Sequence, residues 1–177
     1  GVLFAYTNSS TIQNVTVSNN MQGILLFNSH NNNIVNNTIT LHRDFGIALS
    51  FYSSNNTVSD NSILKNRSTD ETTDGVKLEF HATTNKIIGN IISDNLNGIR
   101  ALASSANVIY HNNFINNTLQ DYGLLSTNIW DNDAEGNYWT EYTGEDLDGD
   151  GIGDTPYVLD TDNKDIYPLV NPYTPSD

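Results

Sequence analysis

Four aspartates at regular spacing give the sequence its clearest chemical signal. Residues 146 to 154 read DLDGDGIGD, which places carboxylates at positions 1, 3, 5 and 9 of a loop and glycine at position 6. Calcium takes about six to eight hard oxygen ligands, and alternating aspartates in a tight turn can direct several carboxylates at one ion. The predicted ligands are the side chains of Asp146, Asp148, Asp150 and Asp154 and the carbonyl of Ile152.

The loop departs from an EF-hand at position 12, where Tyr157 stands in place of the bidentate glutamate. It is more similar to the loops of dockerin-like or thrombospondin-type repeats, and a further ligand is expected from Asp160, Asp162 or Asp165. Magnesium is disfavoured because it retains its waters. The alternative is a solvated acidic turn without an ion, in which the carboxylates would repel one another. We expect structural calcium that fastens the tail to the fold.

The net charge of -14 is concentrated in the same region. Residues 1–130 hold 8 acids and 6 bases, whereas residues 131–177 hold 13 acids and the single base Lys164. We therefore predict two parts, a body over residues 1–130 and an acidic, aromatic cap over residues 131–177. Nucleic acid is not an expected partner, because it requires a positive field. No apolar run approaches the ~20 residues of a membrane span, and there is no cysteine.

Asparagine is unusually abundant, with 28 residues in the chain. Six N-x-S/T sequons favour an extracellular or cell-surface protein, although this composition supplies several such motifs by chance. The candidate glycosylation sites are Asn8, Asn14, Asn36, Asn55, Asn66 and Asn116. The excess of asparagine also suggests a repeated structural role for the side-chain amide.

A repeat of about 23 residues runs through the body. The pattern N-x-I-x-x-N-x-I appears as NNIVNNTI at 32–39, NTVSDNSI at 56–63, NKIIGNII at 85–92 and NVIYHNNF at 107–114. Apolar and polar residues alternate within each unit, which indicates short strands. Glycines are expected to restart the units at Gly1, Gly23, Gly46, Gly75, Gly98 and Gly123.

Short strands of this kind bury their apolar faces only by stacking, so the predicted fold is all-β, a parallel β-helix of about six coils with an irregular C-terminal calcium-binding cap. Residues 65–74 lengthen one unit and are expected to form a loop. The alternative is an antiparallel sandwich, which does not require the same residue type at the same phase of successive units.

Asparagines at fixed phase are expected to form ladders, because an amide at a corner can donate to and accept from the coils above and below. Asparagine also tolerates the left-handed backbone of a sharp corner. The residues expected in these ladders are Asn20, Asn37, Asn61, Asn66, Asn90, Asn95, Asn112 and Asn117.

With these repeats and the GNYWTEYTGEDLDGDGIGDTPYVLDTDNKDIYPLV segment at 136–170, the sequence resembles the NosD-like and carbohydrate-associated β-helix repeats of archaeal and other surface proteins. The resemblance covers nearly the whole chain. It implies a right-handed parallel β-helix and a secreted or surface location, and it does not imply one activity.

Two classes of function stay open. Open coil ends, with Gly1 in phase with the repeat, favour an extracellular subunit of a calcium-stabilised fibre, sheath or surface layer that associates head to tail. The alternative is a carbohydrate-binding or polysaccharide-cleaving module of a larger surface protein. No catalytic residues are predicted, since no basic pair shares a motif with an acid cluster.

Copper, which the NosD name implies, is not expected, because the four histidines fall at different phases of the repeat. The aromatic residues of the cap are expected to plug the apolar column, with sugar stacking as the alternative. These residues are Trp130, Tyr138, Trp139, Tyr142 and Tyr157.

Overall fold

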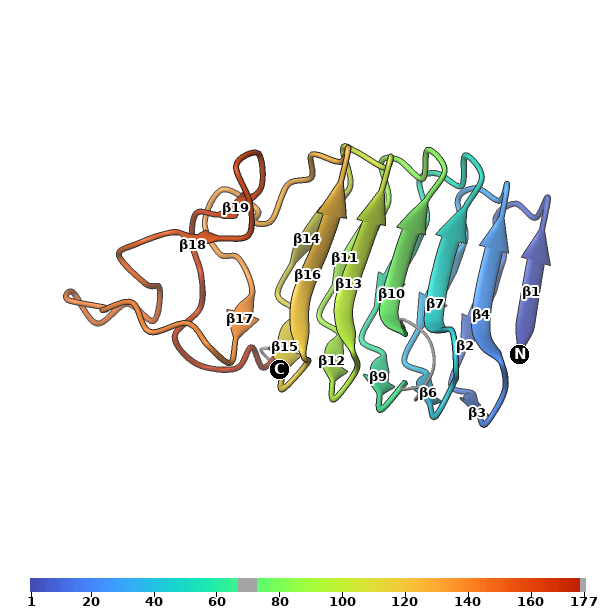
Figure 1. Ribbon diagram of the computed structural model, residues 1–177, viewed down its shortest axis with the longest axis horizontal. Coiled ribbons are helices and arrows are strands. Elements are labelled where there is room, and N and C mark those ends of the chain that lie inside the picture. The colour runs from blue at the N-terminus through green and yellow to red at the C-terminus, as the bar shows by residue number, and fades with distance from the viewer. Residues whose placement is uncertain (67–72, 176–177) are drawn as a thin grey trace.

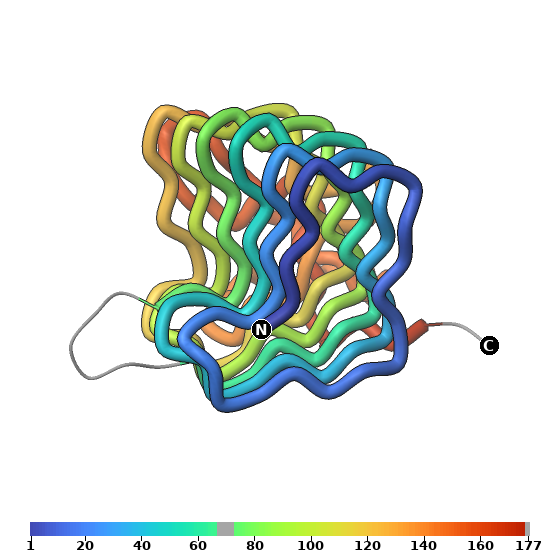
Figure 2. Tube along the Cα trace, turned by 90° about the vertical axis from the view of Figure 1, so that its right-hand side faces the viewer, coloured from blue at the N-terminus to red at the C-terminus, as the bar shows by residue number. Residues whose placement is uncertain are grey.

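The computed structural model describes residues 1–66 and 73–175 and confirms the predicted all-β, right-handed parallel β-helix of about six coils. The coils stack along the long axis of the molecule, and the segments that contain β17, β18 and β19 lie at the end opposite the N-terminus (Figure 1). Viewed along that axis, successive coils lie over one another (Figure 2). The loop expected over 65–74 falls largely outside the described residues.

Three parallel sheets form the walls of the solenoid. Sheet 1 contains β1 (Val2–Ala5), β4 (Gln22–Phe27), β7 (Phe45–Ser50), β10 (Asp74–Glu79), β13 (Asn97–Leu102) and β16 (Leu119–Leu124). Sheet 2 contains β2 (Thr11–Gln13), β5 (Asn33–Val35), β8 (Thr57–Ser59), β11 (Lys86–Ile88) and β14 (Val108–Tyr110). Sheet 3 contains β3 (Thr16–Ser18), β6 (Thr38–Thr40), β9 (Ser62–Leu64), β12 (Ile91–Ser93), β15 (Asn113–Ile115) and β17 (Tyr138–Trp139).

The C-terminal part contains one small antiparallel pair, β18 (Tyr157–Val158) and β19 (Lys164–Asp165). Parallel pairing with the solenoid continues beyond residue 130, because β17 pairs with β15. The division of the chain into residues 1–130 and 131–177 stays a prediction.

The apolar core is a set of columns that run along the solenoid axis. On sheet 1, Ile24, Ile47, Val76 and Ile99 occupy equivalent positions and are fully buried. Stacked aromatic rings close the column, with centroids 4.3 Å apart for Phe114 and Trp139 and 4.6 Å apart for Trp139 and Tyr157. The cap aromatics thus include the plug expected from the sequence, since Trp130 and Trp139 are both buried.

One predicted repeat boundary is wrong. Gly123 pairs with Ala101, so it occupies the phase of an inward-facing core position. The residue equivalent to Gly98 is Gln120, whose carbonyl oxygen would lie 2.6 Å from a Cβ at Gly98. Glycine at this phase lets the backbone of the following coil approach closely. The last coil has Gln120 at this phase and does not require glycine there.

Asparagine side chains form continuous hydrogen-bonded ladders inside the corners. In the ladder through Asn56, its Oδ1 accepts from the backbone N–H and the amide of Asn32, at 2.9 and 3.1 Å. Its own Nδ2 donates to Ser29 O at 2.8 Å and to Asn85 Oδ1 at 3.0 Å. Each amide therefore satisfies backbone groups of the neighbouring coils that would otherwise be buried without partners.

Three ladders run along the molecule. The second ladder passes through Asn37, Asn61, Asn90, Asn112 and Asn137. The third passes through Asn66, Asn95 and Asn117, with His42 in the first position. His42 Nδ1 accepts the backbone N–H of Asn20 at 3.2 Å. The ladder of Asn32, Asn56, Asn85, Asn107 and Asn128 was not among the residues predicted from the sequence.

Asn56→Ala is expected to destabilise the protein strongly, because the buried backbone N–H of Asn32 loses its acceptor, and three further hydrogen bonds, to Asn32 Nδ2, Ser29 O and Asn85 Oδ1, are also removed. At about 1–3 kcal/mol for the buried N–H without a partner and about 0.5–1.5 kcal/mol for each other bond, the loss should exceed about 2 kcal/mol. Urea unfolding measures it. Asn55→Gly is the matched control, since Asn55 is exposed and has a φ of 55° that glycine adopts freely. Equal losses in the two variants would contradict the ladder's role.

Candidate functional site

The acidic loop brings three of the predicted metal ligands together. One carboxylate oxygen from each of Asp146, Asp148 and Asp150 lies within 4.8 Å of the others. Asp146 holds the turn closed, because its Oδ1 accepts the N–H of Gly149 at 2.8 Å and its Oδ2 accepts that of Gly151 at 3.0 Å. Both glycines have positive φ angles, which the tight turn requires. The three oxygens form a hard donor set of the kind that calcium binds.

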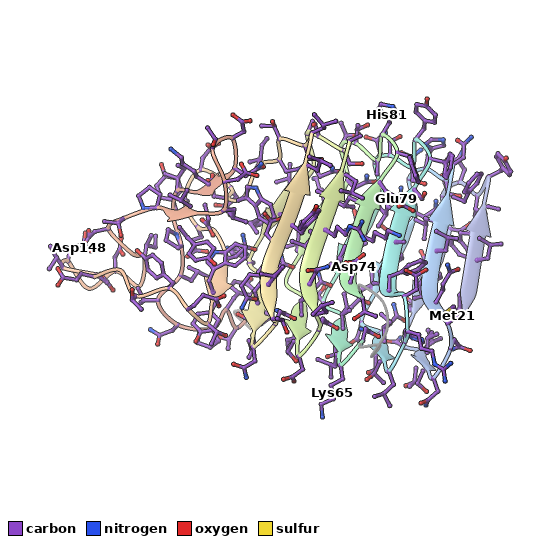
Figure 3. All side chains as sticks on the ribbon, viewed as in Figure 1. Met21, Lys65, Asp74, Glu79, His81 and Asp148 are labelled. Atoms are coloured by element: carbon purple, nitrogen blue, oxygen red, sulfur yellow. The ribbon has the colours of Figure 1, made fainter. Side chains whose placement is uncertain are left out.

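The loop lies far from the coils, as the label of Asp148 shows (Figure 3). It is tied back to them through a short relay of backbone contacts. Gly153 N donates to Pro168 O at 2.8 Å, and Leu169 N donates to Asn137 O at 2.9 Å. Asp154 contributes to the loop's own structure, since its Oδ2 accepts the N–H of Leu147 at 2.7 Å.

The other acids proposed as ligands are outside the group of three. Asp160 closes a separate turn, with its Oδ1 accepting the backbone N–H groups of Asp162 and Asn163 at 2.8 Å each. Asp165 is fully buried, and its Oδ2 accepts from Asn137 N at 2.7 Å and from Trp139 Nε1 at 2.8 Å. Asp165 therefore terminates the second asparagine ladder.

Burial raises the pKa of Asp165 from its ordinary value of 3.8 to about 6, against the opposing effect of its hydrogen bonds. Asp121 also has its pKa raised, to about 7, first by burial and then by the nearby charge of Asp160. Asp121 pairs with Ile99 and so continues an inward-facing column at the last coil. The junction between coils and cap thus contains two carboxyl groups in environments that disfavour their charge.

A second candidate surface lies on the outer face of sheet 1, and the sequence did not predict it. Lys77 on β10 is 3.3 Å from Glu79 and 4.0 Å from Asp44. Arg100, the register partner of Lys77 on β13, is 3.6 Å from Asp74. Asp74 and Glu79 both project from β10, near the middle of the solenoid (Figure 3). The group is hereafter the outer-face network, comprising Asp44, Asp74, Lys77, Glu79 and Arg100.

Asp74 is the most buried member of the outer-face network, with no exposed surface. Its Oδ1 accepts from Asn97 Nδ2 at 2.8 Å, whereas its Oδ2 is buried without a hydrogen-bond partner among the described residues. Burial raises the pKa of this carboxyl above its ordinary value, although Asn97, Arg100 and Lys77 oppose the shift. A buried acid within a charged cluster is a common feature of functional sites.

An aromatic row borders this network where the sheet 1 strands end. It consists of Tyr6, Phe27, Phe51 and Phe80, with ring centroids 5.7, 4.6 and 4.7 Å apart in sequence order. Tyr6, Phe51 and Phe80 directly follow their strands, and their side chains are 75%, 41% and 49% exposed. His81, at the same corner, stacks on Tyr52 at 5.1 Å.

Comparison with known proteins identifies the family. Residues 1–144 match the family described as periplasmic copper-binding protein (NosD). The chain belongs to the NosD family. Two probable ABC transporter binding proteins named NosD match over 97 residues, at 39% identity in Pseudomonas aeruginosa and 36% in Stutzerimonas stutzeri. The match covers 51% of this chain and 22% of each relative.

Solved structures of another protein share the NosD-family fold seen here. A mutant of the periplasmic alginate epimerase AlgG gives a TM-score of 0.65 at 22% identity, covering 77% of this chain and 33% of that one. A second AlgG structure gives 0.63 at 26% identity, covering 76% and 31%. The part of the chain that the structure describes contains no helix long and apolar enough to cross a membrane.

The family name implies copper, and the histidines do not fit a copper site. His42 is buried with both ring nitrogens engaged, by Asn20 N and Val17 O, and burial lowers its pKa. His30 bonds Ser54 and Asn28, and His111 bonds Glu135. Among the described residues, the acidic loop supplies the only group of three or more histidine or acidic ligands. Carboxylates alone do not favour copper over calcium.

The predicted glycosylation sites differ in their accessibility. Asn66 is fully buried and donates its amide to Asn95 Oδ1 at 3.0 Å, so the folded chain does not present it to an enzyme. The remaining five sites are exposed. They are Asn8, Asn14, Asn36, Asn55 and Asn116.

Asp165→Asn is expected to change the pH dependence of stability. Because folding raises the pKa of Asp165 from 3.8 to about 6, its protonation stabilises the fold fully below about pH 4, and this contribution is lost as the pH rises through about 6. The stability of the wild type relative to the variant should therefore fall by on the order of 3 kcal/mol between those limits. Urea unfolding across this range measures it, and a constant difference would contradict the effect.

Proposed function

We propose that this chain is the glycan-binding module of a periplasmic or cell-surface protein, and that the outer face of sheet 1 is its binding surface. The aromatic row is the observation that carries the proposal. Aromatic rings supply large apolar faces at little cost in conformational entropy, and sugars offer apolar C–H faces that pack on them. A row that crosses several coils suits an extended polymer.

The backbone of the aromatic row is strained in a way that supports a role at the surface. The residues that follow the six sheet 1 strands all have positive φ, with 55° at Tyr6, 50° at Phe51 and 52° at Phe80. Such angles are costly for bulky residues, by about 1–2 kcal/mol each, and asparagine is preferred, as at Asn28 on the same corner. Large exposed aromatics therefore occupy positions where stability alone favours asparagine or glycine.

The AlgG structures lend support at the level of fold, because AlgG is a periplasmic alginate epimerase. A parallel β-helix wall is flat and long enough to hold a polymer chain across successive coils. We propose binding and not cleavage for this chain, since Lys77 already pairs with the acids Asp44 and Glu79 of the outer face. Head-to-tail association into a fibre or surface layer stays a prediction.

Replacing both Phe51 and Phe80 with alanine is expected to weaken glycan binding by about tenfold, because each stacked ring contributes about 0.5–1.5 kcal/mol beyond its buried area. Isothermal titration with soluble polysaccharides measures the loss. Leu125→Ala is the matched control, since Leu125 follows β16 at the equivalent corner and is 83% exposed. Undiminished binding by the double variant would reject the aromatic row as the site.

We further propose that the acidic loop binds calcium and that the ion stabilises the cap. The three converging carboxylates support this, as does the relay from Gly153 through Pro168 and Leu169 to Asn137. A cation would relieve the repulsion among Asp146, Asp148 and Asp150 and so hold that relay in place. The candidate ligands Asp154 and Ile152 lie in the same loop, with Asp160 and Asp162 nearby in sequence.

Calcium is expected to raise the unfolding temperature, by more at higher calcium concentration. At a hundredfold excess of calcium over Kd, the free energy of unfolding should increase by about 2.7 kcal/mol. Thermal unfolding with calcium, magnesium and chelator measures it. The pair Asp148→Asn and Asp150→Asn should abolish the calcium effect. Asp133→Asn is the control, because Asp133 is exposed and outside the loop. A calcium effect that survives in the double variant would place the ion elsewhere.

A further inference from the structure

We propose that the glycan bound by sheet 1 is an uncharged polysaccharide and that the outer-face network binds its hydroxyl groups. This inference rests on the glycan-binding function proposed above and names the ligand class and the polar half of the same site. It concerns Asp44, Asp74, Lys77, Glu79 and Arg100, which are brought together from three successive coils.

Among the described residues, the ion pairs of the network differ in length, and the pair of Lys77 and Glu79, at 3.3 Å, is the shortest. Lys77 Nζ lies 4.0 Å from Asp44 Oδ1, and Arg100 lies 3.6 Å from Asp74 Oδ2. Both distances exceed that of a hydrogen bond. A sugar hydroxyl above the gap between Lys77 and Asp44, whose side chains are both partly exposed, can accept from the cation and donate to the carboxylate, because a hydroxyl performs both roles at once.

Polar neighbours orient the acids of the network. Gln22 Nε2 donates to Asp44 Oδ2 at 2.9 Å, and Ser50 Oγ donates to Glu79 Oε1 at 3.2 Å. Asn97 Nδ2 holds Oδ1 of the fully buried Asp74, whose Oδ2 has no hydrogen-bond partner among the described residues. A buried carboxylate oxygen without a hydrogen-bond partner is costly, and the guanidinium of Arg100, 3.6 Å away, offsets part of that cost.

Aromatic rings also fix the two cations. Lys77 Nζ lies 5.6 Å from the ring centroid of Phe45, and the Arg100 guanidinium lies 5.6 Å from that of Tyr122. Each ring limits the motion of a long side chain, so less entropy is lost when a ligand binds. The side chains of Lys77 and Arg100 are only 15% and 24% exposed, so both charges lie close against the sheet.

Charge decides which glycan fits. Among the described residues, the network holds three acids and two cations. A polyuronate or sulfated polymer would therefore meet repulsion from the excess of negative charge at the site. An uncharged polymer meets no such repulsion, and its hydroxyls match alternating donors and acceptors.

The network and the aromatic row form one continuous surface. Glu79 directly precedes Phe80, and Ser50 directly precedes Phe51. Phe27, Ser50 and Glu79 are partners in register on neighbouring strands. A polymer lying along the row therefore has one edge over the outer-face network. Stacking would come from the row, and selection by charge from the network.

Binding of the folded chain to three sets of polysaccharides tests the inference: uncharged glucans, xylans and mannans; polygalacturonate and alginate; and dextran sulfate. The expected result is binding within the uncharged set that changes little with salt. Binding confined to the acidic or sulfated polymers and weakened by salt would overturn the inference and leave the glycan-binding function standing. No binding to any polymer would overturn both.

Variants locate the polar half of the site. Lys77→Ala and Glu79→Ala should each weaken binding of the uncharged polymer by about tenfold or more, as expected when a hydrogen bond to a charged group is lost. Lys86→Ala, at an exposed lysine on sheet 2, is the control. Circular dichroism and urea unfolding show whether each variant folds. If the folded variants bind as tightly as wild type while the aromatic double variant does not, the outer-face network is rejected as the polar site.

Discussion

The fold depends on satisfying buried backbone groups at every corner of the coil. A solenoid turns its chain three times per coil, and each turn leaves N–H and C=O groups that no strand partner can reach. The asparagine ladders provide those partners, as Asn56 does for the N–H of Asn32 and for Ser29 O, both in the preceding coil. A ladder works only when successive coils stay in phase. The amides therefore set the register of the sheets as well as stabilising the corners.

The register set by the ladders also creates the outer face of sheet 1. Lys77 and Arg100 are 23 residues apart in sequence and become direct neighbours only because β10 and β13 pair in phase. Asp44 joins them from before β7. The other members, Asp74 and Glu79, lie with Lys77 on β10 itself. Stacking therefore completes a group that one strand begins, and its chemistry changes with the residues that neighbouring coils add.

The regular part of the fold could be predicted from sequence because it repeats, and the irregular parts could not. Adjacent asparagines such as Asn55 and Asn56 have opposite roles, the first exposed at a positive φ and the second buried in the ladder. The sequence does not distinguish them without the phase of the corner. Gly123 was misplaced because glycine was read as a marker of phase when it occupies a core position. The complete outer-face network was not predicted, because Asp44 and Arg100 join the members on β10 only when neighbouring coils stack.

The end of a ladder imposes a different requirement from its middle. A middle residue must donate to one coil and accept from the other, which asparagine does. The last residue faces only donors, here Asn137 N and Trp139 Nε1, and a carboxylate accepts from both. Asp165 meets this requirement at the cost of burying a charge, which its raised pKa records. The ladder thus ends in an acid supplied by the cap, so the last coil is completed only when residues far along the chain pack against it.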